Sequence, residues 1–421
     1  MNRFTFIYEG FKMAYQAVWT NKLRSLLTMV GVATGIFAIT GILTMVNTLQ
    51  TSVTASLSAL GNTTIFIHHW PWAERNNDWY KFLNRPKVSY RDFQRLEKDL
   101  EDVEAVAFEV NARGKTVQAN GNSVSMIDVA GITHQSGKIK DLEFSQGRYF
   151  SDLESHLGNK VCIIGYNIAE TLFPNRSAIG QYVRIGQTRV MVIGVQSKQG
   201  EGFFPGWPSE DNKVYIPYEM APQMFNLTKR SVDKVILVKA NDYDNLPNVE
   251  QDVISVMRAS RSLKPRMENN FAINKQEALM NSFSSIFDYL ETGGWVISIF
   301  SILIGGFSIG NIMYISVRER TNEIGVQMAL GSNRRFVLYQ FMLEAIILCL
   351  IGGMLGIGIT ILLGTLVQAG LSQTNLALQV AFSLKDLGIG LFVAFLIGLV
   401  AGLVPASMAS RLDPVEAIRQ S

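Results

Sequence analysis

Residues 26–46 read LLTMVGVATGIFAITGILTMV, and this stretch decides the fold class. No charged side chain occurs between Arg24 and Glu74, and these 21 mostly apolar residues match the ~20 that one bilayer crossing requires. Basic residues precede the stretch, as they do in a signal peptide. However, the apolar run exceeds the ~7–15 residues of a signal peptide, and no small-x-small cleavage site follows it. We therefore expect a membrane-spanning helix.

Three further apolar stretches lie in the last third of the chain. Glu291 and Arg318 enclose 26 uncharged residues, and residues 345–367 and 387–404 repeat the pattern. The composition of the 421-residue chain, 48% apolar and 17% charged, is unusual for a soluble cytosolic protein. The sequence therefore predicts an α-helical membrane protein with four transmembrane helices.

Positive charge in the short segments near the span ends predicts the orientation. Residues 1–24 and the 318–335 connection carry four Lys+Arg each, and the C-terminal tail carries two. The short loop 368–386 carries only Lys385. Both termini and the 318–335 connection are therefore expected in the cytoplasm, and the long segment between the first two spans outside it.

This long segment has the composition of a soluble domain. Ser89 is a candidate N-cap for a helix over 90–100, and a second helix is expected over 246–259. Short β-branched runs bounded by Gly, Asn or Pro predict strands at 64–68, 160–165, 182–185, 190–195, 214–216 and 234–238. We expect a large α/β extracytoplasmic domain inserted between helices 1 and 2, in two packed layers.

Helical periodicity continues beyond the first span and begins before the second. The apolar positions that we expect to pack as a stalk are Leu49, Val53, Leu57, Leu279, Phe283 and Ile286. A helix over 275–317 would be about 65 Å long, roughly twice the ~30 Å hydrocarbon core. The alternative is a pair of juxtamembrane linkers, with a break of the second helix at Gly293 and Gly294.

The remaining segments are expected at the cytoplasmic surface. Residues 1–24 place apolar side chains on one stripe opposite basic ones, which predicts an amphipathic helix in the inner interface. Asp413, Pro414 and Glu416 occupy N-cap, N1 and N3 positions of a short helix after the fourth span. This capping pattern predicts a short helix in the tail, but it does not indicate a binding partner.

The 318–335 connection, RERTNEIGVQMALGSNRR, predicts a short helix. Thr321 or Asn322 can cap it and Gly331 can end it, while Ile324 and Met328 share an apolar face. This face either docks on another protein or belongs to a solvated turn.

Glu344 is the one ionisable residue within the predicted spans, and such carboxylates are functional candidates. We expect Glu344 to reach the interface or to pair with Arg334 and Arg335. Four Gly-x-x-x-Gly pairs suit close helix packing or dimerisation, among them Gly31 with Gly35 and Gly306 with Gly310.

Several kinds of chemistry are disfavoured. Residues 131–139, GITHQSGKI, have one residue too many between the glycines and Ile where a Walker A motif needs Ser or Thr, so we expect no ATP binding by this chain. A net charge of +3 gives no reason to expect nucleic acid, and two cysteines exclude a disulfide framework. His68 and His69 are adjacent on a predicted strand, so they are expected to point to opposite faces and to be poor joint metal ligands. We expect neither catalytic residues nor a metal site.

Several stretches resemble the MacB/FtsX-type permease family, the membrane subunits of ABC transporters. They are NKLRSLLTMVGV (21–32), GRYFSDLE (147–154), KVCIIGYNIAETLFPNRSAIGQYVRIGQTRVMVIGV (160–195), FSIGNIMYISVRERTNEIGVQMALGSNRR (307–335) and GLVPASMASRLDPVEAIR (402–419). The resemblance covers nearly the whole chain. Two aromatic-rich segments, 68–80 and 201–208, have no counterpart in the family pattern, and are either partner-facing patches or buried anchors.

The resemblance implies a dimer of permeases, as homodimer or related heterodimer, with cytoplasmic ABC ATPase subunits that bind ATP and Mg²⁺. No cofactor is implied for this chain, and the ATPase is expected on a separate polypeptide, since the fused MacB pumps carry that domain in the same chain. The 318–335 segment would be the coupling helix, with the contact residues Arg318, Glu319, Arg320, Thr321, Glu323, Ile324, Gly325 and Met328.

The implied function is mechanotransmission: the ATPase drives motion of the periplasmic domain of an inner-membrane permease, for efflux or export, with membrane lipid around it. A periplasmic adaptor and an outer-membrane channel are further implied partners. Two alternatives stay open, a signalling scaffold like FtsX that controls a cell-wall hydrolase, and lipoprotein extraction like that of LolC/LolE.

The expected organisation follows from these assignments. Its segments are an interfacial helix (1–24), the first span with its stalk extension (25–60), the α/β domain (61–273), the stalk and second span (274–317), the coupling segment (318–335), the third span (336–367), a short periplasmic loop (368–386), the fourth span (387–404) and a cytoplasmic tail (405–421).

Overall fold

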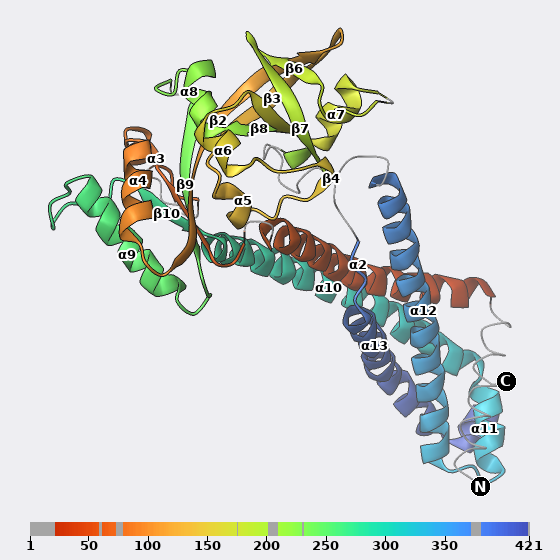
Figure 1. Cartoon of the computed structure of the whole chain (residues 1–421). Coiled ribbons are helices and arrows are strands. Elements are labelled where there is room, and N and C mark those ends of the chain that lie inside the picture. The colour runs from red at the N-terminus through yellow and green to blue at the C-terminus, as the bar shows by residue number, and fades with distance from the viewer. Residues whose placement is uncertain are drawn as a thin grey trace. The chain divides into compact units, whose positions relative to one another are not determined.

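The computed structural model describes residues 22–58, 61–72, 79–174, 176–200, 209–229, 231–371 and 380–419 (Figure 1). The predicted interfacial helix 1–24 lies almost wholly outside the described residues. Segment 201–208 also lies outside them, as do parts of 68–80 and of the loop 368–386. The chain divides into two compact units, Ser52–Ser285 with Asn375–Ala377, and the remainder.

The α/β unit is built on one mixed sheet. Its strands are β1 (Thr64–His68), β2 (Val103–Ala119), β3 (Asn122–Ile132), β4 (Phe144–Gly147), β5 (Val161–Ile164), β6 (Tyr182–Ile185), β7 (Thr188–Gln196), β8 (Lys213–Pro217), β9 (Val232–Ala240) and β10 (Ala272–Lys275). The strand order is β10-β1-β9-β2-β3-β8-β5-β7-β4, and β6 pairs with β2 and β7. The β3–β8 and β5–β7 pairs are parallel, and the other pairs are antiparallel.

Short helices and turns connect these strands. They are α3 (Trp79–Leu83), α4 (Tyr90–Asp99), α5 (Ser136–Ile139), α6 (Asp152–His156), α7 (Tyr166–Leu172), η1 (Glu210–Asn212), η2 (Tyr218–Met220), α8 (Ala221–Met224) and α9 (Leu246–Ser260). The two helices predicted from the sequence are α4 and α9. Ser89 caps α4 as expected: its Oγ accepts the N–H of Asp92, and the Asp92 carboxylate accepts the N–H of Ser89.

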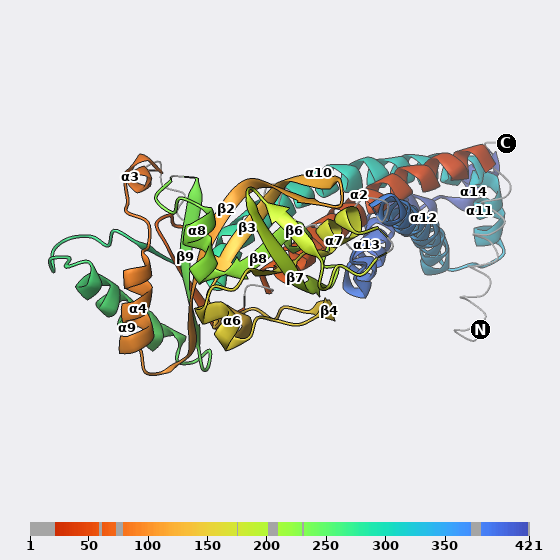
Figure 2. The ribbon, with the colours of Figure 1, turned by 45° about the horizontal axis from the view of Figure 1, so that its top comes forward.

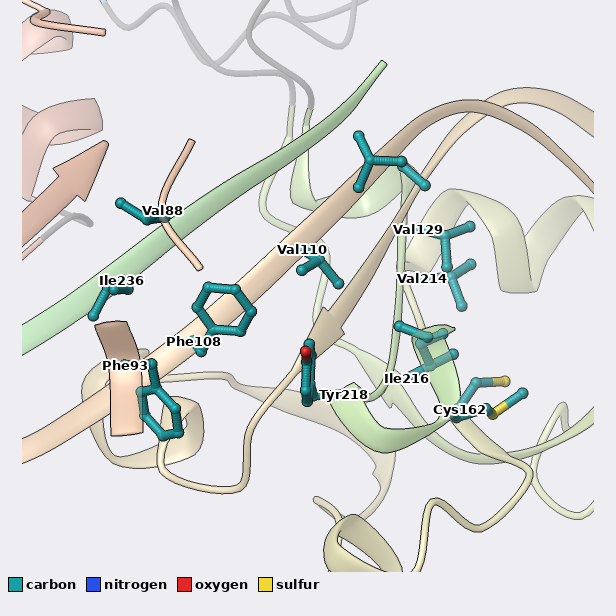
Figure 3. Close-up of a cluster of buried hydrophobic side chains, with 14 of the residues drawn as sticks. Val88, Phe93, Phe108, Val110, Val129, Cys162, Val214, Ile216, Tyr218 and Ile236 are labelled. Atoms are coloured by element: carbon teal, nitrogen blue, oxygen red, sulfur yellow. The ribbon is translucent and has the colours of Figure 1, made fainter. Parts of the chain in front are cut away.

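The core of this unit lies between the sheet and helices α4 and α9, which pack against each other. Phe93 of α4 stacks at 6.0 Å on Phe108 of β2, which meets Tyr218 edge-on at 5.2 Å (Figure 3). Burial of each such side chain contributes about 1.5–3 kcal/mol. Helices α4 and α9 thus form a layer on one face of the sheet, as predicted, while Ile139 of α5 packs on the other face with Ala105 and Ala107.

The long hairpin β2–β3 was not predicted. Its turn is Asn120-Gly121, with φ of +50° and +86°, the two positive values that a type I′ turn requires. Charged residues interrupt the β2 run and obscured its alternation, but the Asn-Gly pair is a sequence signal from which the hairpin could have been found.

The helical unit contains four helices long and apolar enough to cross a membrane, as predicted. They are α2 (Lys22–Ser58), α10 (Gln276–Glu319), α12 (Arg334–Leu371) and α13 (Leu384–Ser410), joined by α11 (Thr321–Ala329) and followed by α14 (Pro414–Arg419). Helix α10 continues through Gly293 and Gly294, so the alternative of a break there is wrong. Helices α2 and α10 also contribute residues to the α/β unit.

Glycines bring the helices of this unit close together, and α2 and α10 run alongside each other (Figures 1 and 2). A Cβ on Gly356 of α12 would lie 2.5 Å from the carbonyl oxygen of Ala33 on α2. A Cβ on Gly398 of α13 would lie 2.7 Å from Cα of Ile346 on α12. Dispersion between closely packed backbones, rather than hydrophobic burial, holds such helices together in lipid.

Candidate functional site

Helix α11 forms the hairpin between α10 and α12, where the coupling segment was predicted. Arg320 occupies its N-cap position, and the hydroxyl of Thr321 donates to the carbonyl oxygen of Arg318 at 2.8 Å. Gly331 follows the helix with a φ of +97°, a conformation that favours glycine, and its N–H donates to Met328. The capping expected at Gly331 is thus confirmed.

One face of α11 is buried in its own chain. Ile324 is 3% exposed and belongs to a cluster with Val317, Val337 and Phe341, against which Met328 also packs. Gly325 is buried as well, and α11 packs on α14. The assignment of Ile324 to a docking face therefore needs correction, because its side chain is part of the core that holds the hairpin.

The opposite face of α11 is open. Glu323 is 72% exposed, Val326 45% and Leu330 84%, and Arg318 and Glu319 are exposed where α10 ends. Val326 in α11 and Leu330 at its C-cap are therefore apolar side chains that the described residues leave largely uncovered.

Arg320 joins this hairpin to the interior of α12. Its Nη1 lies 3.4 Å from Oε2 of Glu344, which is 5% exposed, and its Nε lies 3.2 Å from the exposed Glu323. The guanidinium also stands over the Phe341 ring at 5.6 Å. The expected pairing of Glu344 with Arg334 and Arg335 is wrong, since residue 320 turns inward at the start of α11 while 334 and 335 are exposed.

The expected stalk positions are mostly buried. Val53, Leu57 and Leu279 are 1%, 0% and 6% exposed, Leu49 and Phe283 are half-buried, and Ile286 is 37% exposed. In the helical unit, Gly35 faces Ser301 and Ile42 lies against Gly294, so α2 and α10 are antiparallel. Because the helices are antiparallel, positions stay opposite each other when the same number of residues is counted from Gly35 toward the end of α2 and from Ser301 toward the start of α10. This count places Leu57 opposite Leu279, and Val53 opposite Phe283. The shared register predicts these two contacts.

The predicted glycine pairs lie against helices of the same chain. A Cβ on Gly31 would lie 3.5 Å from Ser308 Oγ, and one on Gly35 3.2 Å from the Ser301 carbonyl oxygen. Gly306 and Gly310 lie against Ile397 and Ala401 of α13. All four glycines therefore serve packing within the chain.

A second buried carboxylate was missed by the sequence analysis. Asp386 lies in the first turn of α13, is 5% exposed and accepts a hydrogen bond from Nδ2 of Asn47 on α2. The fourth span was predicted to begin one residue later, at Leu387, which left Asp386 in a loop. The available signal was Asp386 itself, a carboxylate directly before the apolar run of the fourth span.

The two adjacent histidines also differ from expectation. Strand β1 ends at His68 and the chain bends at His69, so the two rings lie on the same side, with centroids 4.3 Å apart. Strand alternation, from which opposite faces were predicted, no longer applies at residue 69.

Comparison with known proteins finds two family domains in this chain. Residues 25–256 match the model of the MacB-like periplasmic core domain, and residues 295–414 match that of the FtsX-like permease C-terminal domain. The chain is 30% identical over 415 residues to a probable export ATP-binding/permease protein MacB of Pseudomonas entomophila. It is 29% identical over 415 residues to a macrolide export ATP-binding/permease protein MacB of Shewanella sp..

These matches cover 97% of this chain, which spans 58% and 60% of the length of the two relatives. Among solved structures, the periplasmic region of MacB from Actinobacillus actinomycetemcomitans matches 55% of this chain and 97% of its own, with 17% identity and a TM-score of 0.44.

Proposed function

Because the chain belongs to the MacB/FtsX-type family of ABC transporter permeases, we propose that it passes ATP-driven motion from an ABC ATPase to its MacB-like domain and so drives export. In this proposal the α11 hairpin and both termini are cytoplasmic, and the α/β unit is periplasmic. ATP and Mg²⁺ bind on a separate ATPase subunit, and two permease copies assemble, with a periplasmic adaptor and an outer-membrane channel as further partners.

The observation that supports the proposal is that α11 has one exposed face and one buried face. Its outer face exposes Val326 and Leu330, while its inner face is fixed to the helical unit through Ile324. A force applied by a partner on the outer face would therefore move the whole hairpin rather than bend it.

The Arg320–Glu344 pair supports transmission beyond the hairpin. Arg320 stands between the end of α10 and the start of α11, and Glu344 lies more than two turns inside α12. The pair links three helices at one point. Since α10 is one helix from Gln276 to Glu319 and contributes residues to both units, a displacement at Arg320 would be passed along this helix toward the α/β unit.

The test uses the full chain in mild detergent, affinity-purified and examined for co-purifying proteins by mass spectrometry. Leu330→Asp puts a charge on the exposed face of α11 without disturbing the core, and Leu157→Asp, at a 66% exposed position of the α/β unit, is the matched control. We expect a Walker-A ATPase to co-purify with wild type and with Leu157→Asp, and to be lost from Leu330→Asp.

Retention of the ATPase by Leu330→Asp, or its absence from wild type, would overturn the coupling proposal. The phenotype of cells that lack the ATPase separates the remaining alternatives: retention of a small molecule favours export, altered cell shape favours a scaffold that controls a hydrolase, and mislocalised lipoproteins favour lipoprotein extraction.

A further inference from the structure

The end of β1 and the start of β9 bring a histidine and an aspartate together. These strands are antiparallel, with Ile67 opposite Ile236, so the chain leaving β1 passes the residues that open β9. Nε2 of His68 lies 2.8 Å from Oδ1 of Asp233. Because side chains alternate along a strand, residues 233 and 235 share the face that His68 meets.

The bend after β1 adds a second imidazole to this pair. Asn274 of β10, 3% exposed, holds the bend: its Nδ2 donates to the carbonyl oxygen of Trp70 at 3.0 Å, and its Oδ1 accepts the N–H of Trp72 at 2.8 Å. Nδ1 of His69 consequently lies 3.9 Å from Oδ1 of Asp233. Three residues from two strand ends thus offer one ligand atom each, all within 4.8 Å of one another.

One of these atoms makes no hydrogen bond within the described part of the chain. Nδ1 of His69 is buried and makes no hydrogen bond to any described residue, which is costly for a polar nitrogen. The side chains of His68, His69 and Asp233 are 12%, 18% and 31% exposed. The cluster is therefore sheltered from solvent, but an ion can still reach it.

We propose that His68, His69 and Asp233 bind a divalent transition-metal ion of the zinc class. Zinc takes imidazole nitrogen and carboxylate oxygen at ~2.0–2.2 Å, so ligand atoms of a tetrahedral site lie about 3.4 Å apart. The 2.8 Å and 3.9 Å separations bracket that value and the third is at most 4.8 Å, so side-chain shifts of about 1 Å would complete the site.

The surroundings of His68 suit metal binding. Its Nδ1 lies 3.1 Å from the backbone N and 3.4 Å from the carbonyl oxygen of Trp70, so either tautomer finds a partner. When Nε2 gives its lone pair to the metal, the proton moves to Nδ1 and is donated to the Trp70 carbonyl oxygen, while the Trp70 N–H loses Nδ1 as its acceptor. Such an outer hydrogen bond orients a metal-bound imidazole.

An open coordination position would face a cavity. His69 lines a cavity of about 450 Å³ together with Arg85, Lys87, Thr228 and Lys234. Three protein ligands leave a fourth position for water or another ligand. The basic side chains oppose a bare cation, and they favour an anion, such as chloride or a carboxylate, in that fourth position.

The experiment measures Zn²⁺ binding to the full chain, purified in detergent through a tag that contains no histidine. Equilibrium dialysis with metal analysis gives stoichiometry and affinity, and Co²⁺ in place of Zn²⁺ reports tetrahedral coordination through its visible absorption. We expect one ion per chain. His69→Ala should weaken binding by at least about 100-fold, since loss of an outer-shell partner alone costs 10–100-fold.

His156→Ala is the matched control, because His156 is 74% exposed and lies 3.4 Å from Asp152 as an isolated His–Asp pair. It should leave both stoichiometry and affinity unchanged. Asp233→Asn is a second variant, and thermal unfolding without metal establishes whether each variant is folded. Absence of Zn²⁺ binding by wild type, or equal binding by folded His69→Ala, would overturn the proposal.

Discussion

Nη1 of Arg320 lies 3.4 Å from Oε2 of Glu344, across 24 residues of sequence and between two different helices. The same guanidinium donates through Nε to Glu323, so one arginine joins an exposed carboxylate to a buried one. Arginine can contact both carboxylates because its planar guanidinium carries N–H donors at several positions, whereas lysine has a single ammonium group.

Glu344→Gln should destabilise the helical unit, because it leaves the charge of Arg320 without its buried counter-ion. Removal of one partner costs about 3–5 kcal/mol in a fully buried pair, and we expect about 1–3 kcal/mol here because Arg320 is 29% exposed. Glu323→Gln, at a 72% exposed position, should cost under about 0.5 kcal/mol. Thermal unfolding in detergent compares the two, and equal losses would contradict the inward role of Arg320.

Leu57→Cys combined with Leu279→Cys should form a disulfide under mild oxidation, since the α2–α10 register places these buried positions opposite each other. Leu57→Cys with Ile286→Cys is the control, because seven residues along a helix amount to about 10 Å, beyond the ~7 Å limit between Cα atoms. Non-reducing electrophoresis after cleavage between the two sites detects the bond. Burial raises the pKa of the Cys162 thiol, which keeps it unreactive. Similar cross-linking of both pairs would refute the register.

Gly356→Ala should lower the stability of the helical unit, whereas Gly358→Ala should not. The added Cβ at 356 would lie 2.5 Å from the Ala33 carbonyl oxygen, whereas nothing lies within 4 Å of one at 358. The first substitution should therefore push α2 from α12 and lower the unfolding temperature, with a cost of about 1–3 kcal/mol as for overpacking. The second should be neutral or stabilising by up to about 1 kcal/mol. A loss of stability in Gly358→Ala equal to that in Gly356→Ala would show that backbone contact with α2 is not the cause.

Acid should weaken the α/β unit through Asp92. Burial alone would raise the pKa of this carboxyl, but the hydrogen bond from Ser260, the charge of Arg261 and the bonds from Ser89 together lower it. A lowered folded-state pKa gives stability that is present above the unfolded value of ~3.9 and is lost as pH falls through the folded value. Asp92→Asn should cost about 3 kcal/mol at neutral pH, as in breaking a buried pair.

The pH profile of unfolding checks this assignment. The difference between wild type and Asp92→Asn should be constant above about pH 5 and should shrink below about pH 4. Asp102→Asn, which changes an exposed carboxylate, is the control and should follow wild type at every pH. If the difference in stability between wild type and Asp92→Asn stays constant down to pH 2, the negative charge of Asp92 does not contribute to stability.

The sequence was sufficient for features with strong local signals. Four long uncharged stretches predicted four helices, and Ser89 predicted the start of α4 to the residue. Strands β1 and β6 were predicted with their observed bounds: Gly61 and Asn62 lie just before the first, and Gly186 directly follows the second. Period and capping act over a few residues, so they can be predicted from a single sequence.

Other features depend on partners distant in the chain. Nothing near Glu344 indicates Arg320, since the pair exists only because α11 folds back between two helices. Ile324 shared an apolar face with Met328 as predicted, but which face of a short helix meets its own core is decided by the packing of α10 and α12. For His69, one bend at the end of β1 reversed the expected direction of a side chain.

Strand β10 ends at Lys275 and α10 begins at Gln276, so no linker residue separates them. Strand β10 is hydrogen-bonded to β1, with Ile65 opposite Lys275, at the margin of the sheet. A push along the axis of α10 would consequently act as shear on a single β ladder, and slippage of that ladder by one residue would invert which side chains face inward. If α10 transmits force as proposed, the hydrogen bonds between β10 and β1 would bear that load first on this side of the sheet.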